Sequence, residues 1–162
     1  MRSFITLVLV LLLSSIVGFA IEEIVFDPKN VENFDKCMGD KEGCMKSMQK
    51  YYSYPNVVGT NSKYDDKYFG QTVNVKASPE AAKVYFSKKE NVDNMMKTNP
   101  AAADEFFKDP ANVKGMKDIN AADSYFAKKG NLGKNPGSSH EFFSKKYGTD
   151  VMIPSGSTAL YD

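Results

Sequence analysis

The sequence predicts an all-α fold in which short helical repeats stack side by side, as in a solenoid, with roughly 17–21 residues per repeat. Three observations support this fold class. Two adjacent aromatic residues recur along the chain, an Asn and an aliphatic residue follow each pair at a constant spacing, and helix start and stop signals surround each pair. The aromatic pairs are Tyr68-Phe69, Tyr85-Phe86, Phe106-Phe107, Tyr125-Phe126 and Phe142-Phe143.

The residue that follows each pair after four intervening positions is Asn in four copies and Gly in the last. These residues are Asn74, Asn91, Asn112, Asn131 and Gly148. A weaker copy, Tyr51-Tyr52, precedes Asn56. From Asn56 to Gly148 the copies are separated by 18, 17, 21, 19 and 17 residues. A period of this size is typical of a unit that buries its hydrophobic face only against the next unit.

The chain divides into residues 1–20, 21–61, 62–148 and 149–162. The first part is expected to be a signal peptide, because Arg2 precedes an apolar run and Gly18 and Ala20 provide a small-residue cleavage site. Cleavage after Ala20 leaves 162 − 20 = 142 residues, the size of one domain. The alternative is an uncleaved membrane anchor, because residues 4–21 are 18 residues long and just suffice to span a bilayer.

Residues 21–61 are expected to form an N-terminal helical segment with a cysteine pair. An apolar stripe at helical spacing predicts helices over about residues 28–38 and 43–52, with a loop from about 51 to 63. Cys37 and Cys44 lie close together in a chain directed to an oxidising compartment. Gly39 and Gly43 favour a turn between them, which permits an intrachain disulfide. Bridges between chains are the alternative.

Within residues 62–148, each repeat is expected to contain a short helix that carries the aromatic pair. Ser78 and Asn99 each precede a proline and are predicted to be N-caps, with proline at the first helical position. Asn120 and Ser138 are predicted to cap the next two helices. Acidic residues come early in these helices and lysines come late, an order that opposes the helix macrodipole.

The aromatic pairs are predicted to form the core of the stack. In the second copy, Ala82 shares an i, i+3, i+4 face with Tyr85 and Phe86, and other copies repeat this arrangement. A helix of about eight to ten residues is marginal alone, so its rings must be buried against the next copy. Burying one Phe contributes about 1.5–3 kcal/mol. Two rings per repeat therefore supply much of the expected stability.

The recurring Asn admits two structural interpretations. The Asn is either a left-handed residue just beyond the helix, a role in which Asn and Gly interchange, or the cap of a second short helix in the same repeat. Gly148 in the last copy favours the first interpretation. Residues 149–162 are expected to be a flexible tail, with docking on a neighbouring molecule as the alternative.

The composition argues against most chemistry. After removal of Arg2 with the signal, 20 basic residues balance 20 acidic ones, so we expect neither nucleic acid nor an anionic membrane as a partner. His140 is the sole histidine and has no nucleophile elbow or metal-ligand spacing around it. We therefore expect no catalytic residues, no metal and no cofactor, and a protein that is not an enzyme.

The leading functional interpretation is a secreted structural protein whose copies assemble into a fibre, lattice or coat. A near-neutral charge lowers repulsion between copies, and repeat arrays whose end units stay apolar tend to associate. The alternative is a monomeric secreted protein that presents its repeat surface to another secreted protein. Multimers that grow with concentration favour the first interpretation, and a monomer at all concentrations favours the second.

The aromatic pairs with their Asn-Val repeats, the secretory signal and the Lys- and Asn-rich composition resemble, in style, the spore-coat and polar-tube-type repeat proteins of microsporidian parasites. The resemblance covers residues 62–148 and includes no family-specific motif. It implies an extracellular structural role and adds no catalytic residue.

Overall fold

A computed structural model describes residues 34, 36–38 and 43–148, and every regular element within these ranges is helical. The expected signal peptide, the tail at 149–162 and most of the expected helix at 28–38 lie outside the described residues. The elements are α3 Gly43–Tyr51, η1 Pro55–Val57, α4 Ser62–Phe69, α5 Thr72–Ala77, α6 Pro79–Phe86, α7 Lys89–Thr98, α8 Pro100–Phe107, α9 Pro110–Gly115, η2 Ile119–Ala122, α10 Asp123–Phe126, α11 Lys129–Lys134 and α12 Pro136–Tyr147.

Most repeats contain two helices rather than one. The first helix of a copy ends with the aromatic pair, and a second helix begins three residues later. The first helices are α4, α6, α8, η2 with α10, and α12; the second helices are α5, α7, α9 and α11. An extended residue separates them, such as Lys88 with φ −101° and ψ 124°. In the last copy, α12 continues through Phe143 to Tyr147 without this break.

The first helix of every copy is preceded by a capping-type residue seven positions before its first aromatic ring. These residues are Asn61, Ser78, Asn99, Asp118 and Asn135. The prediction that Asn120 and Ser138 are caps was wrong, because Asn120 lies inside η2 and Ser138 inside α12.

Ser78 and Asn99 stand at the predicted cap positions, but neither side chain caps its helix. The hydroxyl of Ser78 instead pairs with that of Tyr68 at 2.8 Å, and the Asn99 amide donates to the carbonyl oxygen of Gly70. Tyr68 belongs to the copy before Ser78, and Gly70 lies two copies before Asn99. These side chains therefore bond to other repeats and do not cap their own helices.

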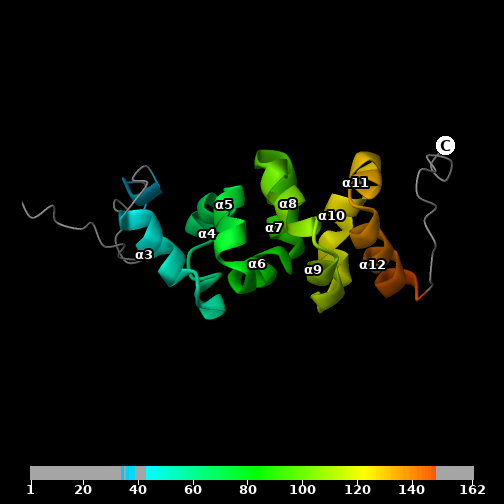
Figure 1. Cartoon of the computed structure of the whole chain (residues 1–162), viewed down its shortest axis with the longest axis horizontal. Coiled ribbons are helices and arrows are strands. Elements are labelled where there is room, and N and C mark those ends of the chain that lie inside the picture. Colours follow the sequence, from blue (N-terminus) through cyan, green and yellow to red (C-terminus); the bar gives the residue numbers. More distant parts are fainter. Residues whose placement is uncertain (1–33, 35, 39–42, 149–162) are drawn as a thin grey trace, which may run out of the picture.

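The helices follow one another along the long axis of the molecule in three rows (Figure 1). One row holds α5, α8 and α11, the second α4, α7 and α10, and the third α6, α9 and α12. The second helices α5, α7 and α9, and η1 before them, each pack against the first helix two copies further along. The observed pairs are η1 with α6, α5 with α8, α7 with α10, and α9 with α12. The stack therefore makes one turn for every three helices, with α3 and α12 near its opposite ends.

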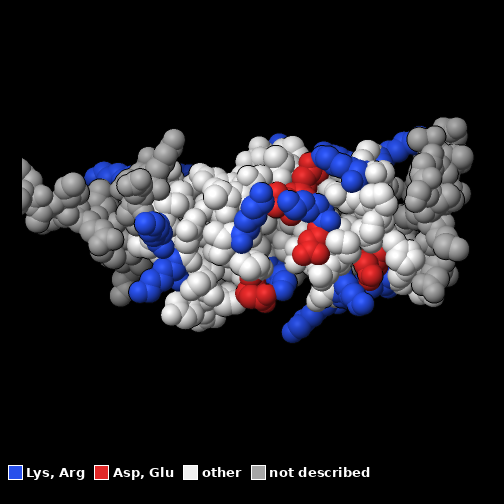
Figure 2. Space-filling view, in the orientation of Figure 1, with Lys and Arg blue, Asp and Glu red and all other residues white. Residues whose placement is uncertain are grey.

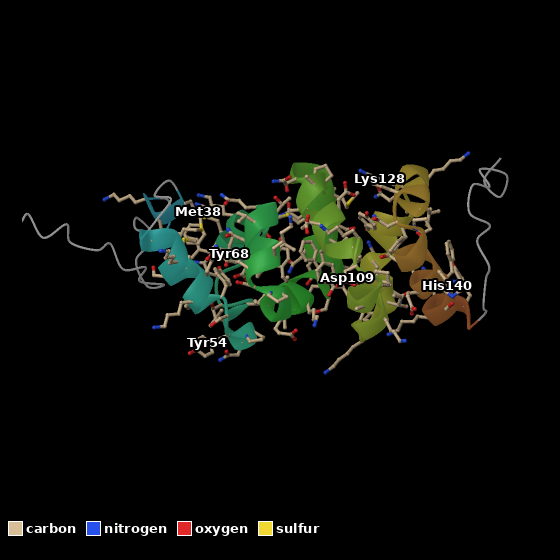
Figure 3. All side chains as sticks on the ribbon, viewed as in Figure 1. Met38, Tyr54, Tyr68, Asp109, Lys128 and His140 are labelled. Carbon is tan, nitrogen blue, oxygen red and sulfur yellow. A yellow bond between two sulfur atoms is a disulfide. The ribbon has the colours of Figure 1, made fainter. Side chains whose placement is uncertain are left out.

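A continuous ladder of aromatic rings forms the core. The second ring of each pair stacks on the first ring of the next pair and meets its own partner edge to face, a favourable geometry for aromatic side chains. The stacked centroid distances are 3.9 Å for Tyr52–Tyr68, 4.7 Å for Phe69–Tyr85, 4.6 Å for Phe86–Phe106, 4.5 Å for Phe107–Tyr125 and 4.5 Å for Phe126–Phe142. Figure 3 shows Tyr68 within the stack and Tyr54 at its edge.

Small residues allow the helices to approach one another closely. Ala82, Ala103 and Ala122 stand three positions before the first ring of their pairs and are at most 1 % exposed. The last copy has Ser139 there instead, equally buried, and its hydroxyl bonds the carbonyl oxygens of Leu132 and Asn135. The hydroxyl is thus accommodated without an unpaired polar group.

The N-terminal part joins the same stack. Cys37 and Cys44 form an intrachain disulfide with a Cα–Cα distance of 4.8 Å, which agrees with the predicted pairing within one chain. Both cysteines are fully buried, as are Phe34 and Met48. Among the described residues, none of the helices has both the length and the apolar character needed to cross a bilayer.

Candidate functional site: the C-terminal end of the aromatic ladder

The structure brings the predicted core residues together in one ladder. All ten lie in it: Tyr68, Phe69, Tyr85, Phe86, Phe106, Phe107, Tyr125, Phe126 and Phe142 are buried, and Phe143 is half-buried. The ladder also extends backward to Tyr52, which belongs to the weak copy in the N-terminal segment. That segment and the repeats therefore share one core.

The four predicted turn or cap Asn residues occupy neither of the positions considered from the sequence. They lie in the first turn of the second helices, whose N-caps are Gln71, Lys88, Asp109 and Lys128. A left-handed conformation is also excluded, since no described residue other than Gly has positive φ. Gly148 alone adopts the predicted left-handed conformation, with φ 67°, at the end of α12.

The Asn side chains instead return to the preceding first helix. Each donates from Nδ2 to the carbonyl oxygen of the first aromatic residue of its own copy, six positions earlier. The distances are 3.1 Å for Asn74–Tyr68, 2.9 Å for Asn91–Tyr85, 2.9 Å for Asn112–Phe106 and 2.9 Å for Asn131–Tyr125. Because the last carbonyls of a helix lack partners within it, this bond stabilises the junction between the two helices.

Buried tyrosine hydroxyls link neighbouring copies through aspartates. Tyr85 donates to Asp66 at 2.5 Å and Tyr125 to Asp104 at 3.0 Å, each aspartate standing two residues before the first ring of the preceding copy. Burial, with the nearby carboxylates, raises the pKa of both hydroxyls. Burial also raises the pKa of Tyr68, to about 12. These groups remain protonated donors over the physiological pH range and serve the packing of the repeats.

The ladder ends at α12, and there its geometry changes. The rings that close the inner pairs stack on the next copy with centroids 3.9–4.7 Å apart. Phe143 instead stacks at 5.9 Å on Tyr147 of its own helix, and 60 % of the Tyr147 surface is exposed. Tyr147 therefore occupies the position that the first ring of a following copy would take, but at a longer centroid distance than in the inner stacks.

A hollow of about 420 Å³ lies at this end. We define the terminal slot as the part of the hollow formed by Phe126, Leu132, Phe142, Phe143, Lys146 and Tyr147. The adjoining helix α11 holds Gly130 and Gly133, and a Cβ added to either would meet no atom of the described residues within 4 Å. The described part of the chain therefore leaves space beside the last second helix as well as at the last rings.

Charged groups near the slot are paired. Lys146 bonds Asp123, which also lines the hollow, and this bond raises the lysine pKa. Elsewhere, Lys134 pairs with Asp104, and Lys89 with Asp93. Figure 2 shows acidic and basic side chains interspersed over the middle of the stack rather than separated into one charged field. The character of the slot therefore comes mainly from its rings.

A second hollow, about 440 Å³, lies between α6 and α9, where a first helix and the second helix of the following copy leave space between them. Lys83, Phe106, Asn112 and Met116 are among its lining residues. Its surface mixes apolar and charged groups. It provides a groove along the side of the stack, distinct from the slot at its end.

The described residues hold no group of three or more His, Cys, Asp or Glu side chains arranged to bind a metal ion. His140 lies in α12 near the C-terminal end (Figure 3). The chain matches no protein-family model, no curated protein and no solved structure.

Sequence reasoning missed the terminal slot because Tyr147 lies outside the aromatic-pair pattern. One signal could have revealed it: Tyr147 is four residues after Phe143, the spacing of neighbours on a continuous helix. The tyrosine–aspartate links also left a signal. Asp66 and Asp104 stand two residues before the first ring of the copies followed by Tyr85 and Tyr125, whereas Lys83 stands there in the copy followed by Phe106. The signal is not exclusive, because Asp123 stands there in the copy followed by Phe142 and pairs with Lys146 instead.

Proposed function

We propose that this chain is a secreted, non-enzymatic structural protein whose copies associate through the ends of their helical stacks into an extracellular fibre, lattice or coat. The observation that supports this proposal best is the open C-terminal end of the aromatic ladder. There, Phe143 is half-buried and Tyr147 is 60 % exposed beside a hollow lined by aromatic rings. Exposed rings at the end of an otherwise buried core favour association.

Two further features favour the proposal. The balance of 21 basic and 20 acidic residues leaves a formal net charge of +1 for the whole chain, so long-range repulsion between copies is weak. The intrachain disulfide stabilises the segment in an oxidising environment, which agrees with secretion.

Sedimentation velocity and negative-stain microscopy on residues 21–162, over a range of concentrations and with or without reductant, test the proposal. We expect ordered multimers whose mass grows with concentration. Phe143→Asp places a charge at the open end and should shift the population to monomer, whereas Val73→Asp, at a side chain 54 % exposed on α5, should not. A monomer at every concentration would refute self-assembly.

The alternative is a monomeric secreted protein that binds another protein along the side of its stack. The hollow between α6 and α9 favours this function, because Phe106 and Met116 supply apolar contact and Lys83 supplies a charged group. A monomeric chain whose ligand perturbs residues of this groove, and none of the terminal slot, would support the alternative.

A further inference from the structure

We propose that the terminal slot is a binding site for a short α-helix from another polypeptide, one that ends in two adjacent aromatic residues preceded by two small residues. This inference deepens the proposed function, because it names the chemistry of the partner at the same end of the stack. It relies on that function only in taking this end as the point of association.

The same helix–helix interface recurs along the chain. Each of the elements η1, α5, α7 and α9 packs against the first helix two copies further along. The next second helix, α11, has no such helix after α12 among the described residues. Its glycines at 130 and 133, one helical turn apart, have no atom from residues 34–148 that the structure describes within 4 Å of a Cβ built on them. The interface is formed four times within the chain. At α11 a fifth interface of the same kind would have its second helix present and its first helix missing from the described residues.

The terminal slot lacks a ring that covers Phe143 as closely as the inner closing rings are covered. In every inner copy the closing ring is covered by the first ring of the next pair. Phe126, for example, is covered by Phe142 at 4.5 Å and is 2 % exposed. Phe143 has Tyr147 at 5.9 Å in that role. A partner that reproduces the inner geometry therefore stacks one ring on Phe143. Its second ring meets its own first ring edge to face.

The first helices inside the chain also indicate which residues the partner helix carries before its rings. In the copies of Tyr85, Phe106 and Tyr125, the residues three and four positions before the first ring are buried alanines, as Ala102 and Ala103 are before Phe106. These positions allow the helix axis to approach the neighbouring second helix closely. The inner copies thus define the ligand: a helix of about two turns with small residues on its inner face and aromatic residues at its end.

The chain's own tail does not have this pattern. Residues 149–162 contain Tyr161 as their sole aromatic residue, with Pro154 and Gly156 before it, and no aromatic pair. A helix that matches the inner copies therefore comes from a second polypeptide.

A peptide with the sequence of residues 99–108, Asn-Pro-Ala-Ala-Ala-Asp-Glu-Phe-Phe-Lys, is the probe, and the same peptide with both Phe replaced by Ala is its control. Each is titrated into isotope-labelled residues 21–162, and amide shifts are followed by NMR. We expect saturable shifts at Leu132, Phe143 and Tyr147 with the aromatic peptide. No saturable shifts at millimolar peptide, equal shifts with the control, or shifts confined to the groove between α6 and α9 would overturn the proposal.

Substitutions in the slot test its residues individually. Phe143→Ala should weaken peptide binding at least tenfold, because it removes the ring on which the partner stacks. Tyr147→Ala removes the ring that the partner must displace from Phe143, so it should strengthen binding without disturbing a buried side chain. Tyr54→Ala is the matched control, because Tyr54 is 59 % exposed and Tyr147 60 %. Equal affinities for Tyr54→Ala and Tyr147→Ala would refute a role for Tyr147.

The tail is tested in the full chain. If Val151→Ser with Ile153→Ser allows binding that the unaltered chain lacks, the tail occupies the slot and the proposal is wrong. Self-association, measured without peptide, is a separate readout. A chain that remains monomeric but binds the peptide at the slot would refute assembly and support this inference. A chain that assembles but does not bind the peptide would support assembly and refute this inference.

Discussion

The side-chain amide of Asn112 donates to the main-chain carbonyl of Phe106 at 2.9 Å, and this bond recurs at the same spacing in three other copies. It joins the end of one helix to the first turn of the next. Because Val113 follows Asn112 and is fully buried, the same short segment both holds the junction and enters the core.

Asn112→Ala should lower the free energy of unfolding by about 1–2 kcal/mol, because it leaves a partly buried carbonyl without its donor. Urea denaturation followed by circular dichroism provides the measurement. Asn120→Ala, at an exposed position in η2, serves as the control and should change stability little. Equal effects of the two substitutions would contradict a specific role for the recurring amide.

Phe107→Ala should destabilise the stack by about 3–5 kcal/mol, the range for truncating a buried Phe. Phe107 is fully buried, stacks on Tyr125 and meets Phe86 edge to face, so its removal interrupts the ladder between two copies. Thermal melting compared with Val73→Ala, on the exposed face of α5, tests this. An unchanged melting curve would show that the ring contributes no core packing.

Replacing both Cys37 and Cys44 by Ser should lower stability by about 2 kcal/mol, because the disulfide closes a short loop and restricts the unfolded chain. The bond lies within one chain. The unaltered protein should therefore contain no disulfide-linked dimer on a non-reducing gel, and reductant should change stability without changing the mass of an assembly. A disulfide-linked dimer would contradict the intrachain pairing.

Alkaline pH should unfold the stack. The native pKa of Tyr68 is raised to about 12 by burial, above the value near 10 of an unfolded tyrosine. The folded state thus holds this proton more strongly, and the resulting stability is present below pH 10 and is lost as pH rises through 12. Burial raises the pKa values of Tyr52, Tyr85 and Tyr125 as well, and they act in the same direction.

Urea denaturation at pH 9, 10 and 11 measures this loss. Tyr68→Phe should reduce its slope by up to about 1.4 kcal/mol per pH unit, the amount for one proton. Identical slopes for the two proteins would show that Tyr68 ionises equally in the folded and unfolded states.

Several features of the fold could be predicted from local pattern. The aromatic pairs, their burial and the helix that precedes each pair follow from helical spacing and composition, because a short amphipathic helix must cover its apolar face. The caps were harder to place. Asn120 and Ser138 look like caps locally, but the cap position lies seven residues before the first ring, where Asp118 and Asn135 stand.

The sequence by itself determined that short helices would stack through paired rings, since no single helix of this length can bury them alone. Only the tertiary structure decided which helix meets which: α5, α7 and α9 each reach the first helix two copies away, a contact outside the range of local periodicity. It likewise decided that Asn112 bonds backward to Phe106 and that Phe143 ends the ladder beside an exposed Tyr147. The pairing of helices two copies apart depends on the turn of the whole stack, which is set by side chains far apart in the chain. The Asn112–Phe106 and Phe143–Tyr147 contacts join residues only six and four positions apart, and they depend on where each helix ends.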